Sequence, residues 1–167
     1  MNFKEYLNSL MILHVALLAG QVFFIAIIYF LFNANEPPLT GVEATGQMEV
    51  YIIGLLTIAC VLASSHLFGR RIRALKEENS LSAKLSGYRA ASILRYALLE
   101  GPSLIAIMFY LIANNLILLI FSAMIVILFI VYRPTKERLV ADLELSPSEQ
   151  AKLDDPNAIV TEMEVRS

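Results

Sequence analysis

Four stretches of the chain are almost free of charged residues, and they cover residues 10–32, 50–68, 96–113 and 116–132. A helix of about 20 apolar residues crosses the ~30 Å hydrocarbon core of a bilayer, and in lipid its backbone polar groups must pair within the segment. The pattern therefore predicts four transmembrane helices. Asn114-Asn115, between the last two stretches, predicts a tight turn, because one helix through both would be too long for a bilayer.

The basic residues predict how these spans are oriented. Lys4 precedes the first span, seven Lys and Arg lie between the second and third, and five follow the fourth, which accounts for all 13. The 33–48 connection and the Asn114-Asn115 turn contain none. Because Lys and Arg accumulate in cytoplasmic loops, we expect both termini in the cytoplasm. The fold class is then an all-α integral membrane four-helix bundle of two helical hairpins.

The predicted membrane domain covers residues 1–133, and residues 134–167 form a cytoplasmic tail. The tail should begin with a helix over Thr135–Leu145 after Pro134. The motif Ser146-Pro147-Ser148-Glu149 is a capping box with proline at the first helical position, so it predicts a second short helix to about Leu153. From Asp154 onward the chain is acidic and is expected to be disordered.

The segment between the second and third spans, residues 69–95, predicts a basic cytoplasmic hairpin. The second span should continue as a helix to Asn79, and Asn79 or Ser80 should cap a new helix that runs toward Arg95. Long basic side chains of such a hairpin can lie along lipid headgroups. The residues expected to make these headgroup contacts are Arg70, Arg71, Arg73, Lys84 and Arg89.

Three ionisable residues fall inside the predicted spans: His14, His66 and Glu100. Such residues are costly in lipid and are therefore functional candidates. Counting about 1.5 Å per residue, we expect all three in one polar layer near the cytoplasmic ends of their spans. The residues expected to support this layer are Gln21, one heptad after His14, Arg95, and Pro102, which removes a backbone hydrogen bond from its helix.

The polar layer has four interpretations. It can be structural, with His and Glu bonded to each other, to Arg95 or to water. It can be a proton or ion relay, because His and a buried carboxylate change protonation usefully. Two His and one Glu also suit zinc, and His14 with His66 suits bis-histidine haem ligation. Neither cofactor has a supporting spacing motif, so we expect no metal and no other cofactor.

Composition and motifs exclude several classes of protein. The chain is 57% hydrophobic and only 17% charged, and its net charge is −2, so we expect no nucleic-acid partner. Its single cysteine, Cys60, excludes an intramolecular disulfide and a dithiol redox pair. All three aspartates lie in the tail, and the sequence contains no G-x-S-x-G, H-E-x-x-H or P-loop motif. We therefore expect a protein that is not an enzyme.

The segment VYRPTKERLVADLELSPSEQ after the last span, together with the four-span layout, resembles small bacterial membrane proteins that have no assigned function. This resemblance implies a location in the bacterial inner membrane and no particular chemistry. We expect an accessory or scaffold protein whose basic hairpin and tail contact anionic lipid headgroups or a membrane or cytoplasmic protein partner. The alternative is a small oligomeric transporter, or a proton-coupled permeation protein, that uses the His/Glu layer.

Overall fold

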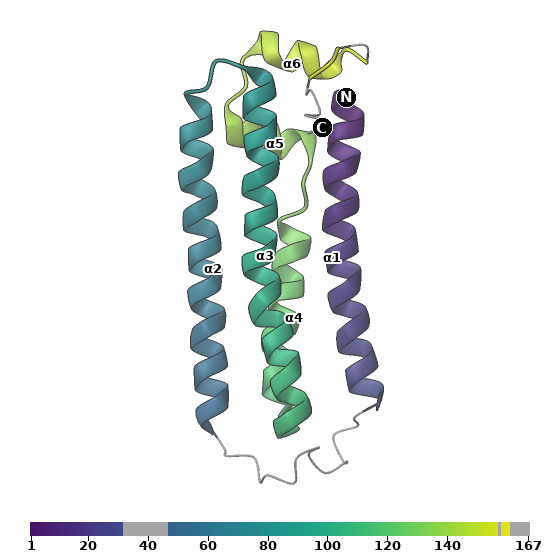
Figure 1. The fold of residues 1–167 in the computed structure, drawn as a ribbon, viewed down its shortest axis with the longest axis vertical. Helices are drawn as coiled ribbons and strands as arrows, with labels where there is room; N and C mark the ends of the chain where they lie inside the picture. The colour runs from purple at the N-terminus through teal and green to yellow at the C-terminus, as the bar shows by residue number, and fades with distance from the viewer. Residues whose placement is uncertain (32–46, 157, 161–167) are drawn as a thin grey trace, which may run out of the picture. The chain divides into compact units, whose positions relative to one another are not determined.

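A computed structural model describes residues 1–31, 47–156 and 158–160, and in these ranges the regular elements are all helices. In chain order they are α1 (Phe3–Leu31), α2 (Gln47–Lys76), α3 (Leu81–Ala113), α4 (Leu116–Val131), α5 (Lys136–Leu143) and α6 (Pro147–Asp154). Figure 1 shows them coloured from purple α1 to yellow α6. The predicted all-α class is confirmed.

Three of these helices are long and apolar enough to cross a membrane: α1 over Phe3–Phe30, α2 and α3. Helix α4 is strongly apolar but has only 16 residues, or about 24 Å at 1.5 Å per residue. It is bent by 82° from α5, and the pair counts as a fourth candidate only if it is one broken span. The chain thus has the helices of a membrane protein, with three or four candidate spans among its described residues.

The helices form two compact units that do not follow the order of the chain. Unit 1 comprises Met1–His14, Ser65–Arg95 and Arg133–Ser167, and unit 2 comprises Val15–Ser64 and Tyr96–Tyr132. Each of α1, α2 and α3 therefore contributes one end to unit 1 and the other to unit 2. The segment from residue 134 onward, predicted as a separate tail, belongs to unit 1. The disorder predicted from Asp154 onward falls partly on residues 157 and 161–167, which lie outside the described residues; within the described part, Asp154 ends α6 and Val160 is buried.

Unit 2 contains the predicted turn between its two C-terminal helices, and this prediction is confirmed. Helix α3 ends at Ala113 and α4 begins at Leu116. Asn114 adopts a left-handed backbone conformation with φ 50°, which asparagine tolerates better than most residues. Asn115 then caps α4, because its side chain accepts a hydrogen bond from the Ile117 amide at 3.0 Å. Two adjacent asparagines thus reverse the chain without a glycine.

The core of unit 2 is apolar. One buried cluster takes side chains from all four of its helices: Ile28, Ile53, Ala106, Ile107, Tyr110, Ala113, Leu118 and Leu119. Antiparallel packing of α3 and α4 is marked by stacked rings of Tyr96 and Phe129, 5.6 Å between centroids. It is also marked by the Ser122 hydroxyl, which donates to the Ser103 carbonyl at 2.9 Å. The buried hydroxyls of Thr57, Ser64 and Ser122 in this unit donate to backbone carbonyls.

Candidate functional site

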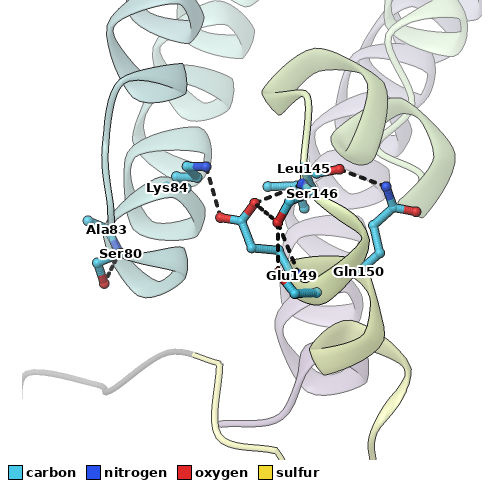
Figure 2. A network of polar contacts seen from close by, with 8 residues as sticks. Ser80, Ala83, Lys84, Leu145, Ser146, Glu149 and Gln150 are labelled. Atoms are coloured by element: carbon cyan, nitrogen blue, oxygen red, sulfur yellow. Dashed lines mark hydrogen bonds and ion pairs between the residues drawn. The ribbon is translucent and has the colours of Figure 1, made fainter.

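The polar network of unit 1 starts at the first turn of α6. The Ser146 hydroxyl accepts a hydrogen bond from the Glu149 amide at 3.3 Å, and Glu149 Oε2 accepts one from the Ser146 amide at 2.8 Å. Pro147 occupies the first helical position, where its missing N–H leaves no intrahelical bond unmade. The capping box predicted from the sequence is therefore confirmed, and it fixes the direction of the Glu149 side chain (Figure 2).

The other carboxylate oxygen of Glu149 binds a lysine of α3. Lys84 Nζ lies 2.8 Å from Glu149 Oε1, and the two side chains are only 9% and 18% exposed. This hydrogen bond is the main cause that lowers the pKa of Glu149; burial opposes it, and the Ser146 hydrogen bonds and the Lys84 charge add to the lowering. One carboxylate thus caps α6 and also joins it to the start of α3, as Figure 2 shows.

Two further contacts join the segment after α4 to the α2–α3 hairpin. Lys76 Nζ lies 2.7 Å from Glu144 Oε1 in a more exposed ion pair. The Tyr88 hydroxyl donates to Asp142 at 3.2 Å. Apolar side chains of the same segment are buried, namely Leu139, Leu143, Leu145 and Leu153. The segment is therefore packed within unit 1 by leucines and held by charged groups at their margin.

The beginning of α1 is attached to the same unit. The Tyr6 hydroxyl, on a side chain that is 1% exposed, donates to the Leu85 carbonyl at 2.7 Å. Arg89 Nη2 donates to Ser9 Oγ at 3.1 Å. In Figure 1, α5, α6, the start of α3 and the N-terminus of the chain lie at the same end. Segments more than 70 residues apart in sequence thus build one polar and apolar assembly.

The five residues predicted to contact headgroups have different surroundings in unit 1. Arg70, Arg71 and Arg73 are exposed. Lys84 is buried and paired with Glu149, and the half-buried Arg89 binds Ser9. The structure therefore gives the last two residues protein partners, and it leaves the first three at the surface of α2.

The residues of the predicted polar layer are divided between the two units. His14 and His66 belong to unit 1 and Glu100 to unit 2. The His14 side chain is buried, whereas His66 is exposed and Glu100 is partly buried. Within residues 1–31, 47–156 and 158–160, no group of three or more His, Cys, Asp or Glu side chains is arranged to hold a metal ion. Joint action of the three residues stays a prediction.

The three supporting residues also have distinct positions. Gln21 is buried in unit 2 at 1% exposure, and among the described residues neither atom of its amide has a hydrogen-bond partner. The Arg95 guanidinium lies over the Phe68 ring, 4.3 Å from its centroid, a cation–π contact. Pro102 is buried, and α3 continues through it without a break in the helix.

The sequence did not predict the contacts that join the segment after α4 to the α2–α3 hairpin, although one signal was present. Leu139 and Leu143 are four residues apart, which places both on one face of a helix and indicates a face that must be covered. The acidic partners Glu149, Asp142 and Glu144 carry no such signal, because acidic residues that only face solvent occur at the same spacing in a sequence.

Comparison of the chain with protein-family models, with curated proteins and with solved structures gave no match.

Proposed function

We propose that the protein is a non-enzymatic scaffold of the bacterial inner membrane, with four spans and both termini in the cytoplasm. In this proposal unit 2 is the anchor in the bilayer, and unit 1 is a folded head at the cytoplasmic surface. The head contacts anionic lipid and presents its outer face to a protein partner. Support for the orientation comes from the basic residues, all of which lie in the termini and the α2–α3 hairpin.

The observation that carries the proposal is the way unit 1 is built. The segment after α4 has buried leucines, and the Lys84–Glu149 pair joins it to the hairpin. A free tail would not need a nearly buried ion pair, since burying charges costs free energy unless they are paired. A fixed surface assembled from three distant segments of the chain suits the binding of a partner.

Unit 2 supports an anchoring role. Its central cluster is apolar and draws side chains from all four helices. The buried hydroxyls of Thr57, Ser64 and Ser122 donate to backbone carbonyls, as hydroxyls in membrane helices commonly do. Large apolar side chains such as Leu62, Met124 and Ile127 are exposed, which suits contact with lipid.

The orientation is tested by cysteine labelling in a Cys60→Ser background. Ser148→Cys in α6 should react with a membrane-impermeant maleimide only after the inner membrane is opened, and Asn114→Cys should react in intact spheroplasts. Reaction of Ser148→Cys in intact spheroplasts would refute the orientation.

The scaffold role is tested by photo-crosslinking in living cells. A photoreactive residue at Ala141 or Ala151, both exposed in unit 1, should capture one and the same protein. The capture should weaken when Glu149→Gln loosens α6, and it should not occur from Ile127 in unit 2. Capture that is equal from all three positions would contradict docking on unit 1.

A second candidate, the proton-coupled transporter, is favoured by Gln21. Its buried amide, with no partner among the described residues, is a polar group in the apolar half of α1, where such groups are often functional. Glu100→Gln should then abolish proton-coupled flux in vesicles while the protein still folds. Glu137→Gln, on the exposed surface of α5, is the matched control. Normal flux in the Glu100 variant would rule out a relay through this carboxyl.

A further inference from the structure

A groove runs along the α2–α3 hairpin within unit 1. It holds about 410 Å³, and its walls include Arg71 and Ala74 from α2, Glu78 from the link after α2, and Ala90 and Leu94 from α3. A second hollow of about 420 Å³ continues it along α2, sharing Arg71 and Ala74 and adding Leu67 and Arg70. Along α2 the two hollows extend from Leu67 to Leu75, or about 12 Å at 1.5 Å per residue.

Small residues allow the two helices to form this groove. A Cβ atom added at Gly87 would lie 2.2 Å from Leu75 Cδ2, so the helices approach one another closely at this point. Ala74 and Ala90, which line the groove beside the contact of Gly87 with Leu75, have small side chains and leave this space open. Apart from Glu78, its walls belong to helices, so the groove is a consequence of close helix packing with little side-chain volume.

Two arginines of the groove differ from the other basic residues of the hairpin. Lys76 and Lys84 are in ion pairs, and Arg89 and Arg95 are held by Ser9 and by the Phe68 ring. Arg73 donates to the Gly69 carbonyl. Arg70 and Arg71 are exposed, and neither is in an ion pair with another described residue. Two arginines that line the same hollow are thus left to bind a group outside the chain.

The groove is amphiphilic along its length. Leu67 and Leu94, which are 36% and 38% exposed, lie at the end nearest the apolar stretches of α2 and α3. Arg70 and Arg71 follow one turn later along α2, and the acidic residue Glu78 lies beyond the end of α2 at Lys76. An apolar end beside a cationic centre matches an acyl chain joined to a phosphate.

We propose that this groove binds one anionic phospholipid from the cytoplasmic leaflet. The phosphate binds Arg70 and Arg71, whose planar guanidiniums suit phosphate oxygens, and the upper part of an acyl chain lies against Leu67 and Leu94. Two guanidiniums and one carboxylate leave a positive excess, so an anionic headgroup is favoured over a zwitterionic one. This inference rests on the proposed orientation, and it adds a defined lipid site to the general contact of a basic surface with headgroups.

The test is native mass spectrometry of the full-length protein titrated with phosphatidylglycerol, phosphatidylethanolamine or inorganic phosphate. Wild type should retain one phosphatidylglycerol molecule in preference to phosphatidylethanolamine. Arg70→Gln with Arg71→Gln should weaken this binding about tenfold, as expected for the loss of charge-assisted hydrogen bonds. The matched control, Arg73→Gln with Arg133→Gln, removes two exposed arginines outside the groove and should bind as wild type.

A variant that keeps every charge provides a second test. Ala90→Phe fills the groove and should weaken phosphatidylglycerol binding, whereas Ala141→Phe, on α5, should not. Equal weakening in the arginine control, equal binding of phosphatidylethanolamine, or full competition by inorganic phosphate would each overturn the proposed lipid site. Labelling of Ser148→Cys in spheroplasts separates the two proposals: lost lipid selectivity with correct labelling refutes only the groove, and reversed labelling refutes the orientation itself.

Discussion

Replacing Glu149 by glutamine separates the two tasks of its side chain. Glutamine still serves at the third position of a capping box, so the bond to the Ser146 amide is kept. The substitution removes the negative charge and the second oxygen, which accepts the hydrogen bond from Lys84 at 2.8 Å. The matched control is Glu144→Gln, which removes the charge facing Lys76 at 2.7 Å. The two variants make the same chemical change in pairs of similar length.

The burial of each ion pair determines how much free energy of unfolding its loss costs. Breaking a buried ion pair from one side costs about 3–5 kcal/mol, and an exposed pair contributes about 0–1 kcal/mol. The Lys84–Glu149 side chains are 9% and 18% exposed, against 32% and 69% for the Lys76–Glu144 pair. With its single oxygen on the Ser146 amide, glutamine turns an NH2 group toward Lys84 and cannot accept from it. Because the Lys84–Glu149 pair keeps some contact with solvent, we expect Glu149→Gln to cost about 2–3 kcal/mol and Glu144→Gln less than about 1 kcal/mol.

The assay is native-state hydrogen exchange of the α6 amides, which reports the free energy of local opening. A loss of 2 kcal/mol corresponds to about thirtyfold faster exchange. Adding Lys84→Met to Glu149→Gln should recover most of the loss, because an apolar side chain leaves no unpaired buried charge. If Glu149→Gln accelerates exchange no more than Glu144→Gln does, the Lys84–Glu149 pair contributes nothing beyond a surface contact and the reasoning fails.

The same pair predicts a pH dependence. The folded-state pKa of Glu149 is lowered, chiefly by the hydrogen bond from Lys84. The stabilisation is therefore fully present above the ordinary glutamate pKa of about 4.3, and it is lost as the pH falls through the lower folded-state value. Protection of α6 should decrease below about pH 4.3 in wild type, and this decrease should be absent in Glu149→Gln. An identical acid response in both proteins would assign the effect to other carboxylates.

Three further substitutions test the packing. Gly87→Ala should destabilise unit 1 by about 1 kcal/mol through overpacking, since its Cβ would meet Leu75 at 2.2 Å; Leu75→Ala in the same protein should relieve that clash in thermal unfolding. Ser122→Ala should cost about 0.5–1 kcal/mol in unfolding in mixed micelles, because it removes the 2.9 Å bond to the Ser103 carbonyl; a larger loss would indicate a further partner. Asn115→Ala should cost about 1 kcal/mol through loss of the α4 cap, and exchange at the start of α4 that equals wild type would argue against that cap.

The local features of this protein were predictable from its sequence. The apolar stretches become α1 to α4, the Asn114-Asn115 turn falls between Ala113 and Leu116, and the capping box starts α6 at Pro147. Each of these features depends on residues within a few positions of one another. Turn conformation, caps and apolar length are properties of a short backbone segment, so its residues carry the information.

The tertiary structure alone decided which distant residues meet. Lys84 was expected at lipid headgroups, yet it is paired with Glu149, 65 residues away. His14 and His66 have similar depth by counting along their spans, yet one side chain is buried and the other is exposed. The residues next to a charged side chain or an imidazole in the sequence do not indicate whether it faces solvent, lipid or another part of the protein. Its environment is set by which helix faces pack together, and that choice is made by apolar burial over the whole chain.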